Sequence, residues 1–333
     1  MARASALTRF GNDLYTGARS FDFVGRRWWW YGIAAVLLAI AIVVPIIRGG
    51  FVWSIEFSGG SQYTVSNVAE PNQRLAEDAV RSVVADAVPR VTTVGADGRS
   101  IQVQTATVDP SRSDEVKKAL ADAYGVPVTD VAATSISGTW GSDITWSAVR
   151  ALIIFVVLAA IFMAIYFRTW KMSVAAIVSL IHDMVITIGV YGVFGFEISP
   201  AAVIGFLTIL GYSLYDTVVV FDKVRENTKQ DGEESVRTFP ESVNMAVNQT
   251  LVRSINTGVI AVLPVAAILW IGALVLGAGT LRDIALALFI GIIIGTYSTI
   301  FIAAPLYAQM REREPKIRRH TERVLALRAK AVE

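Results

Sequence analysis

The chain has no cysteine and only 2 histidines in 333 residues. The absence of cysteine excludes disulfide frameworks, thiolate nucleophiles and zinc sites with cysteine ligands. Neither His182 nor His320 belongs to an HExxH pattern, and neither a Walker-type phosphate loop nor a GxGxxG dinucleotide pattern occurs. We therefore expect a protein that is not an enzyme and that uses no metal or other cofactor.

Charge is also scarce. Only 17% of the residues are charged and the formal net charge is +2, which is too small for a nucleic-acid surface, so we expect no nucleic-acid partner. By contrast, 54% of the residues are hydrophobic and the mean hydropathy is +0.52, more than soluble domains normally show. These values indicate a membrane protein, in contact with membrane lipid.

Six stretches are long and apolar enough to cross a membrane, because about 20 helical residues span roughly 30 Å of hydrocarbon. We predict these helices at residues 28–47, 147–167, 172–194, 200–221, 255–276 and 284–307. The first stretch is followed by Arg48 rather than by a small-residue cleavage site, so we expect it to be retained. Trp28, Trp29 and Trp30 at its start are typical of the aromatic belt at headgroup level.

Lysine and arginine gather in alternate flanks of these helices, whereas the short connection 195–199 holds only Glu197 as a charged residue. Since basic flanks stay cytoplasmic, we expect a multi-pass protein of the cytoplasmic (cell) membrane with both termini in the cytoplasm. The predicted parts are a cytoplasmic leader (1–27), a first helix (28–47), an extracytoplasmic domain (48–146), a helix bundle (147–307) with a cytoplasmic loop (223–250), and a basic cytoplasmic tail (308–333). The tail is either solvated, in contact with lipid, or in contact with the ribosome or a motor protein.

The outer segment is long enough to be a domain. Its apolar patterns predict strands at 52–66, 91–94, 100–107 and 130–138, and helices at 73–87 and 113–124. The order β-α-β-β-α-β is the ferredoxin-like arrangement. The predicted fold class is thus a polytopic α-helical membrane protein with six transmembrane helices and an extracytoplasmic α+β ferredoxin-like domain between helices 1 and 2. Such a fold hosts many functions and does not choose one.

Asp216 lies about four residues inside the end of the fourth apolar stretch. An ionised acid at a helix centre costs roughly 2.5 to 3.5 kcal/mol on insertion scales. Keeping a carboxyl protonated near pH 7 costs a similar amount, about 4 kcal/mol at 1.36 kcal/mol per pH unit. A carboxyl balanced in this way can bind and release a proton. The alternative is a permanent pair with a basic residue that only fixes helix packing.

Arg253, at the entry of the fifth helix, is the best candidate partner in the sequence. If the fourth helix descends to the cytoplasm and the fifth rises from it, Asp216 and Arg253 lie at a similar depth near the same face. The alternative is that Arg253 extends to phosphate headgroups, as arginines at helix ends commonly do.

His182 and Asp183 form a second polar pair, near the middle of the third helix. They either extend a proton relay or are satisfied inside the bundle by hydroxyls such as those of Ser179 and Thr187. The charges of residues 222–226, at the exit of the fourth helix, favour structural anchoring at the water interface.

Several glycines and one polar stretch have simpler interpretations. Gly59 and Gly60 lack a following helix with lysine, which favours a bulge or tight turn over a phosphate site. Gly291 and Gly295 have the spacing of a close helix contact, and Gly205 and Gly211 in the fourth stretch are also expected to allow close backbone approach rather than to bind a ligand. The stretch 233–249 alternates polar and apolar residues and predicts a short amphipathic helix along the cytoplasmic interface.

Four stretches together resemble the SecF family of protein-export membrane subunits: GYSLYDTVVVFDKVREN (211–227), NQTLVRSINTG (248–258), IEFSGGSQY (55–63) and HD (182–183). The resemblance in order and spacing extends from the first helix to the sixth. The residues of the first two motifs that we take as candidate site residues are Gly211, Tyr212, Ser213, Thr217, Asp222, Arg225, Glu226, Asn227, Gln249, Thr250 and Asn256.

The resemblance implies a subunit that acts with SecD beside the SecYEG channel and the SecA motor, with YajC as a candidate companion. It implies use of the proton-motive force to assist translocation of a polypeptide, on half of a resistance-nodulation-division fold. The family's coupling acid falls on Asp216 and its companion arginine on Arg253. Many members have asparagine before that acid, whereas Tyr215 stands here, so we count Tyr215 with His182 and Asp183 as candidate relay residues.

Two other functions remain open on the residues alone. One is a proton-driven exporter of a small molecule or lipid, built from the same half-unit. The other is a scaffold without transport activity that holds translocon subunits together. Six helices with a single outer domain and no second copy make half of a two-fold repeat transporter, so each of these functions predicts a partner chain.

Overall fold

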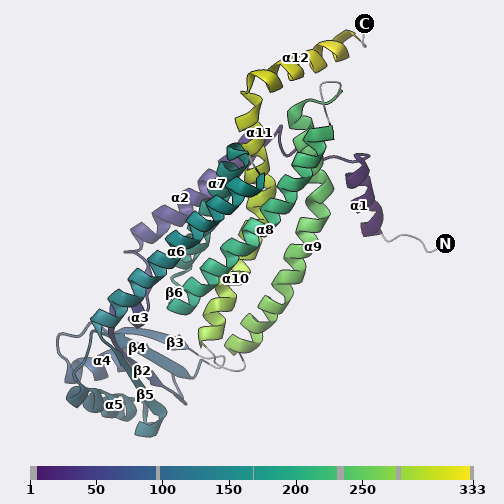
Figure 1. The fold of residues 1–333 in the computed structure, drawn as a ribbon. Coiled ribbons are helices and arrows are strands. Elements are labelled where there is room, and N and C mark those ends of the chain that lie inside the picture. The colour runs from purple at the N-terminus through teal and green to yellow at the C-terminus, as the bar shows by residue number, and fades with distance from the viewer. Residues whose placement is uncertain (1–5, 95–97, 168, 231–235, 275–278, 331–333) are drawn as a thin grey trace.

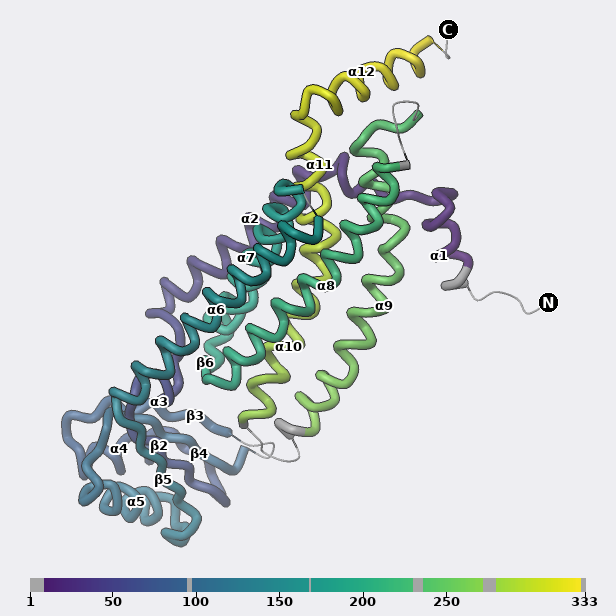
Figure 2. The backbone as a smooth tube through the Cα atoms, viewed as in Figure 1, coloured from purple at the N-terminus to yellow at the C-terminus, as the bar shows by residue number. Residues whose placement is uncertain are grey.

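The computed structural model describes residues 6–94, 98–167, 169–230, 236–274 and 279–330. A bundle of long helices carries a small sheet domain at one end, while the first and last helices lie at the opposite end (Figure 1). The tube view shows the same division, with α1 and α12 far from the sheet (Figure 2).

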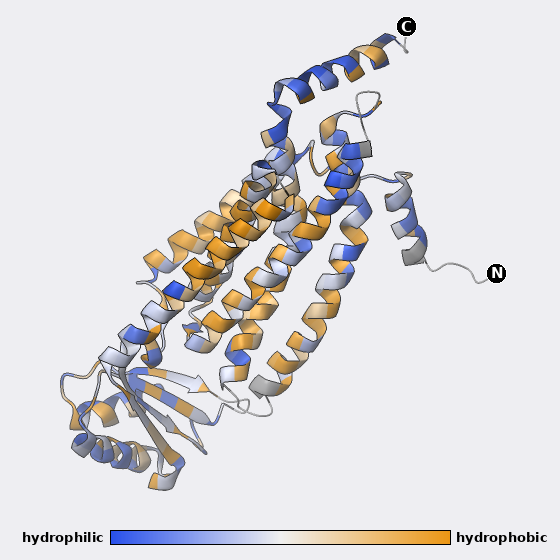
Figure 3. Ribbon diagram, viewed as in Figure 1, coloured by the Kyte–Doolittle hydropathy of each residue, from blue (hydrophilic) through white to orange (hydrophobic). Residues whose placement is uncertain are grey.

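Six helical segments are long and apolar enough to span a membrane, which confirms the number predicted from the sequence. They are α2 (Arg27–Ile47), α6 (Gly138–Phe167), α7 (Trp170–Phe194), α8 (Pro200–Gln230), α9 (Phe239–Leu274) and a last span made of α10 (Gly279–Ser298), η2 (Thr299–Ala303) and α11 (Ala304–Glu312). Apolar residues cover the middle of the bundle, and polar residues gather at its ends and over the sheet domain (Figure 3).

Several helix boundaries differ from the sequence prediction. The second span begins at Gly138 rather than at residue 147, because its polar first turns continue the helix outside the apolar run. The loop predicted at 223–250 is wrong over most of its length. Helix α8 continues to Gln230 and α9 begins at Phe239, with Pro240 in its first turn, where a proline is tolerated. The predicted amphipathic stretch is therefore mostly the first turns of α9.

The last span changes its hydrogen-bond pattern in the middle. Residues Thr299–Ala303 form a π-helical turn between α10 and α11. Pro305, at the start of α11, has no N–H to donate to the preceding turn, so the regular α pattern cannot continue through it. Such turns are rare and often mark functional sites.

Close packing between α8 and α10 depends on glycine. A Cβ at Gly205 would lie 2.6 Å from the Cβ of Ala287, and a Cβ at Gly291 would overlap the side chain of Ile209. The absence of side chains at these positions lets the two backbones approach, as expected for helices packed in a membrane. Gly291, but not Gly211, fits the close-approach interpretation, since nothing lies within 4 Å of a Cβ at Gly211.

The sheet domain has the predicted element order. Its antiparallel sheet has the strand order β3-β4-β2-β5. The elements are β2 (Gly60–Val65), α4 (Gln73–Val83), β3 (Arg90–Val94), β4 (Ser100–Thr105), α5 (Pro110–Tyr124), η1 (Val128–Asp130) and β5 (Val131–Ile136). Tyr63, Ile101, Val103 and Leu120 lie in its core.

The strand predicted at 52–66 is divided. It begins with β1 (Val52–Trp53), turns through the short helix α3 (Ile55–Ser58) and resumes as β2 after Gly59 and Gly60. Both glycines have positive φ, 71° and 139°. A Cβ at Gly59 would lie 2.8 Å from the Cα of Gly138. The two glycines therefore form a tight turn against the start of α6, in agreement with the structural interpretation.

The sheet domain is joined to the bundle by a second, two-stranded sheet. Strand β1 pairs in parallel with β6 (Glu197–Ile198), the connection between α7 and α8. Gln104 of β4 donates a hydrogen bond of 2.7 Å to Glu197. The connection between the third and fourth spans thus contacts the sheet domain directly.

At the other end, α1 (Ala6–Thr16) is held against α9 through the segment that follows it. Asn244 accepts hydrogen bonds from the N–H groups of Phe23 and Val24, and Asn248 accepts one from that of Phe21. Both amides donate in return to the carbonyl of Phe21. The described part of the leader is therefore a fixed part of the bundle, and α12 (Pro315–Lys330) extends from the same end.

Candidate functional site

Polar side chains from four helices meet inside the bundle. Asp183 of α7 and Asp216 of α8 are 0% and 3% exposed. The other buried polar side chains of this layer are Ser179, His182, Thr187, Ser213, Thr217, Ser254, Ser298 and Thr299. Since burying polar groups in a membrane is unfavourable unless they find partners, such a layer is a candidate functional site.

Asp216 is bonded across the contact between α8 and α9. Its Oδ1 accepts a hydrogen bond of 2.9 Å from the hydroxyl of Ser254. Its Oδ2 is buried and makes no hydrogen bond to any described residue. Half of the carboxyl is therefore available to carry a proton or to accept a new partner without breaking an existing bond.

Arg253, the expected partner of Asp216, lies on the neighbouring helix α9. It does not form an ion pair with Asp216 in this structure. Its side chain is exposed and its guanidinium donates to the hydroxyl of Tyr215 at 3.4 Å. Tyr215 is itself 55% exposed. The structure brings together Arg253 and Tyr215 on the outside of the α8–α9 contact, and Asp216 and Ser254 on the inside.

Asp183 has more partners than Asp216. Ser213 of α8 donates to its Oδ2 at 2.5 Å, and Nδ1 of His182 lies 3.2 Å from its Oδ1. The hydroxyls of Ser179 and Thr187, which the sequence analysis offered as partners, make no hydrogen bond to described residues. Asp183 is thus bonded by a serine of α8 rather than by those hydroxyls, and Nε2 of His182 is buried without a hydrogen-bond partner among the described residues.

The two carboxyls lie on neighbouring turns of the same layer. Ser213, which bonds to Asp183, is three residues before Asp216, so both face the same side of α8. Thr217 on the next position bonds to Thr299 in the π-helical turn at 3.0 Å. The layer therefore connects α7, α8 and α9 with the irregular part of the last span.

The remaining motif residues lie at the end of the bundle away from the sheet domain. Tyr166 donates to Asp222 at 2.6 Å, and Lys223 pairs with Glu226 at 2.9 Å. These contacts agree with the expected anchoring.

Asn227 donates to Gln249 at 2.9 Å, and Gln249 donates to the carbonyl of Tyr15. These bonds tie α8 and α9 to the leader. Arg225 lines a cavity considered below.

Three further motif residues form no hydrogen bond with the polar layer within the described part of the chain. Thr250 bonds to the carbonyl of Ala246 in its own helix. Asn256 is exposed, and the Tyr212 hydroxyl is buried with no hydrogen-bond partner among the described residues.

The sequence analysis missed Ser254 and Thr299. Ser254 follows Arg253 directly, and its position four residues after Thr250 was the signal that a polar side chain faces inward there. Thr299 carried a weaker signal, namely its place next to Ser298 in an otherwise apolar span.

The layer contains carboxyl and hydroxyl groups that are buried in the bundle. In the part of the chain that the structure describes, no three histidine or acidic side chains lie close enough together to hold a metal ion. Carboxyls bonded to hydroxyls bind and release protons, which is what the arrangement can do chemically.

Comparison with known proteins identifies the relatives of the chain. Residues 115–313 match the family model described as "Protein export membrane protein SecD/SecF, C-terminal". The chain belongs to the SecD/SecF family. It is 43% identical over 328 residues to the protein translocase subunit SecF of Mycobacterium tuberculosis, covering 96% of this chain and 73% of the relative. It is 44% identical to SecF of Streptomyces coelicolor, covering 98% and 86%.

A solved structure has the same fold. The crystal structure of SecDF, a translocon-associated membrane protein from Thermus thermophilus, superimposes with a TM-score of 0.74 at 32% identity. The aligned part covers 89% of this chain and 39% of SecDF. The chain thus spans about two fifths of that relative, and the relatives together support a role in protein translocation.

Proposed function

We propose that the chain is a subunit of the protein-export machinery that couples the proton-motive force to translocation of polypeptides, with Asp216 as the proton-binding group. The observation that carries this proposal is the state of the Asp216 carboxyl. It is buried, bonded to Ser254 through one oxygen, and without a hydrogen-bond partner among the described residues on the other.

The contact between α8 and α9 is the element that protonation acts on. In one arrangement, which is the one seen, Arg253 lies on Tyr215 and Asp216 on Ser254. In the proposed second arrangement Asp216 is ionised and Arg253 turns inward to it. Two arrangements of one contact, each favoured by one protonation state, are what a population shift needs.

The energy available fits a ratchet. One proton that moves through 100 mV releases about 2.3 kcal/mol. At 1.4 kcal/mol per decade, this biases two orientations of a domain by roughly fiftyfold. It is enough to favour forward movement of an unfolded chain and too little to pull a folded domain apart.

We propose the ferredoxin-like sheet domain as the part that acts on the polypeptide, on the extracytoplasmic side. The basic flanks lie at the end of the bundle that carries α1 and α12, and the sheet domain lies at the opposite end (Figure 1). Since basic flanks are cytoplasmic, this geometry supports cytoplasmic termini and an outer sheet domain in the cell membrane. Strand pairing between β1 and β6 is the path by which helix movement reaches that domain.

The proposed partners follow from the relatives and from the exposed faces. SecDF of Thermus thermophilus contains the equivalent of this chain as 39% of a longer one, which supports SecD as the partner that supplies the rest. Helices α6 and α9 expose apolar faces, including Ile153, Val157, Val259 and Leu263. SecYEG, SecA and YajC are proposed as further members of the assembly.

The test is export into proton-energised vesicles by the full complex. Asp216→Asn and Arg253→Met are expected to lose the proton-dependent stimulation of export at unchanged membrane levels. Asp143→Asn and Arg150→Met are matched controls, because both residues are exposed on α6 and lie outside the polar layer. These controls are expected to behave as wild type.

Two outcomes favour the alternatives. Full proton-dependent export in Asp216→Asn would leave only the scaffold function. Proton-driven release of a small molecule or lipid by the chain and its partner, without the secretion channel, would favour an exporter half-unit.

A further inference from the structure

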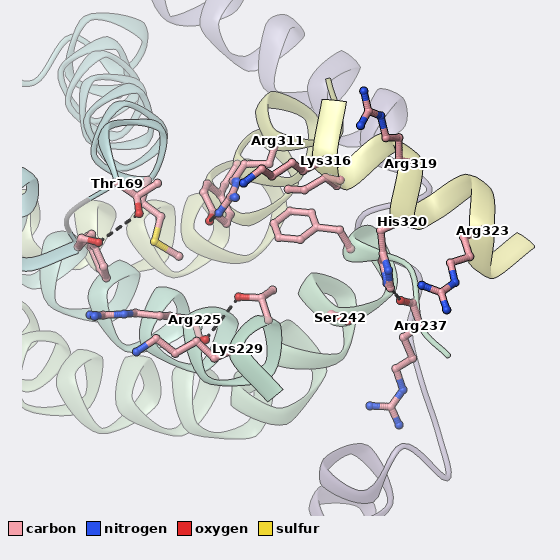
Figure 4. Close-up of a pocket in the computed structure, with 16 residues that line it drawn as sticks. Thr169, Arg225, Lys229, Arg237, Ser242, Arg311, Lys316, Arg319, His320 and Arg323 are labelled. Carbon is pink, nitrogen blue, oxygen red and sulfur yellow. Dashed lines mark hydrogen bonds between the residues drawn. The ribbon is translucent and has the colours of Figure 1, made fainter. Parts of the chain in front are cut away.

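A cavity of about 830 Å³ lies at the end of the bundle away from the sheet domain. Its walls come from the end of α8, the start of α9, the connection between α6 and α7, and from α11 and α12 (Figure 4). The polar layer lies elsewhere in the bundle and none of its residues lines this cavity.

The cavity is strongly basic. Arg225 and Lys229 of α8 line it, as do Lys316, Arg319 and Arg323 of α12; Figure 4 shows these residues on the two helices. No acidic residue is among its lining residues in the described part of the chain. This concentration of one charge sign is unfavourable by itself and is relieved when an anion binds.

Among the described residues, these five cations differ from their neighbours in having no carboxylate within ion-pair distance. Arg311 also lines the cavity, but it pairs with Glu314 at 3.0 Å, as does Lys171 nearby at 2.9 Å. Within the described residues, Arg225, Lys229, Lys316, Arg319 and Arg323 form no ion pair. Their charges are thus available to a ligand.

The floor of the cavity is apolar. Phe167, Met172, Phe239 and Tyr307 line it and are all buried in the bundle core. A site with cations at its rim and apolar side chains at its base complements a molecule that has a charged head and a hydrocarbon portion.

The position of the cavity along the bundle, at the level where the spans end, indicates that this molecule comes from the bilayer. Phe167 is the last residue of α6 and Thr169 precedes α7, so the cavity lies where these two spans end. Trp170, the first residue of α7, is 66% exposed, as expected for a residue of the aromatic belt at headgroup level. Basic pockets between helices at this level suit anionic headgroups.

We propose that this cavity binds the phosphate headgroup of an anionic phospholipid from the adjoining leaflet. The cations of α8 and α12 hold the phosphodiester, and the apolar floor holds the start of the acyl chains. Binding bridges α8 and α12, so lipid fixes α12 against the bundle. The proposal does not depend on proton coupling or on the export partners.

The experiment measures lipid retained by the full chain after extraction from nanodiscs made of equal parts phosphatidylglycerol and phosphatidylcholine. Native mass spectrometry counts the bound lipids. Wild type is expected to retain phosphatidylglycerol over phosphatidylcholine by about tenfold. Lys316→Gln/Arg319→Gln and, independently, Lys229→Gln/Arg323→Gln are expected to lose most of that preference.

A control of equal charge separates the cavity from general attraction to the membrane. Arg26→Gln/Arg313→Gln removes two exposed cations from the same end of the bundle, and neither residue lines the cavity. This variant is expected to keep the preference. An equal loss in the control and in both cavity variants would overturn the proposal, because the preference would then come from net charge alone.

Two further arms distinguish other anions. Inorganic phosphate and a single-stranded RNA oligonucleotide are added to the protein in phosphatidylcholine nanodiscs, and thermal unfolding is followed. Little stabilisation by either supports a lipid site. Stabilisation by phosphate or by RNA that exceeds that of phosphatidylglycerol, and that the cavity variants abolish, would assign the cavity to a soluble anion or to nucleic acid and overturn the proposal.

Discussion

Ser254 of α9 donates a hydrogen bond of 2.9 Å to Asp216 of α8, while Arg253, one residue earlier, lies outside the contact on Tyr215. Adjacent residues of a helix point about 100° apart. The inward position therefore belongs to a neutral hydroxyl and the outward one to a cation. Bringing Arg253 inward takes a rotation of α9 of that order or a swing of the long Arg253 side chain, which makes this pair the first place to test.

A double-mutant cycle on Ser254→Ala and Asp216→Ala tests the bond. Removing either partner leaves a buried polar group without its bond, so each single variant is expected to lower thermal stability in lipid nanodiscs. The coupling energy is expected to be about 0.6 to 1.7 kcal/mol, the range of hydrogen bonds between membrane helices. Additive effects would show that the hydroxyl and the carboxyl do not interact. Thr250→Val, one turn away on α9, is the control for loss of a hydroxyl.

Glycine at position 291 is expected to be required for packing, whereas glycine at 211 is not. A Cβ at Gly291 overlaps Ile209, but a Cβ at Gly211 meets nothing within 4 Å. Gly291→Ala is expected to destabilise the bundle by about 1 to 3 kcal/mol through overpacking. Gly211→Ala is expected to be neutral or stabilising by up to about 1 kcal/mol, from helix propensity. Unfolding in nanodiscs measures both, and equal effects would contradict the packing described.

The contact between the sheet domain and the bundle is expected to weaken as the pH rises. Burial raises the pKa of the Glu197 carboxyl above its usual value, against the opposing hydrogen bond from Gln104. The folded state therefore prefers the neutral carboxyl, and the resulting stability is present below the pKa of the free group and lost as the pH rises through the folded pKa.

Glu197→Gln is expected to remove this pH dependence. At pH 7.5 the amide of Ser54, which donates to Ile198 at 3.0 Å, is expected to exchange more slowly in the variant than in wild type. At pH 4 the two proteins are expected to exchange alike. Slower exchange of wild type at pH 7.5 would show that the ionised carboxyl stabilises the contact.

Asn248 is expected to hold the leader in place. Asn248→Ala removes two hydrogen bonds to Phe21. At about 0.5 to 1.5 kcal/mol each, their loss is expected to expose the segment and to speed trypsin cleavage after Arg19 at least severalfold. Asn256→Ala, an exposed asparagine on the same helix, is expected to leave cleavage unchanged. Cleavage at the wild-type rate in Asn248→Ala would show that other contacts hold the leader.

The number of spans was predictable because hydropathy alone indicates it. The ends of the helices could not be predicted in the same way. Residues 223–230 and 239–250 are polar, and a helix that continues beyond the membrane has no hydropathy signal to separate it from a loop. The order of the sheet elements was predictable because alternation and turn residues are local, whereas the helical turn at Ile55–Ser58 depends on contact with α6.

The sequence predicts which residues belong to the candidate site but not which of them are in contact. Asp216 stands out because an acid in an apolar run is conspicuous. Its partner Ser254 does not stand out. The rotation of α9 about its axis decides whether Arg253 or Ser254 points toward Asp216, and the sequence does not determine that rotation. The basic cavity was beyond prediction for a related reason. It exists only because α12 passes beside the start of α9 and the segment before it, to which His320 and Arg328 bond it, and the cations of α8 and those of α12 are more than 80 residues apart in the chain.

Helix α6 passes without a break from the sheet domain into the membrane. It has 30 residues, begins two positions after β5 ends, and contacts the turn at Gly59. At 1.5 Å per residue it is about 45 Å long, and it enters the bundle as a single rod. A tilt of about 5° at its membrane end therefore swings the far end by about 4 Å, roughly the spacing between two strands. Under the proposed function, movements inside the bundle that are too small to disturb its packing would thereby be magnified into displacements of the sheet domain comparable with the distance between neighbouring strands.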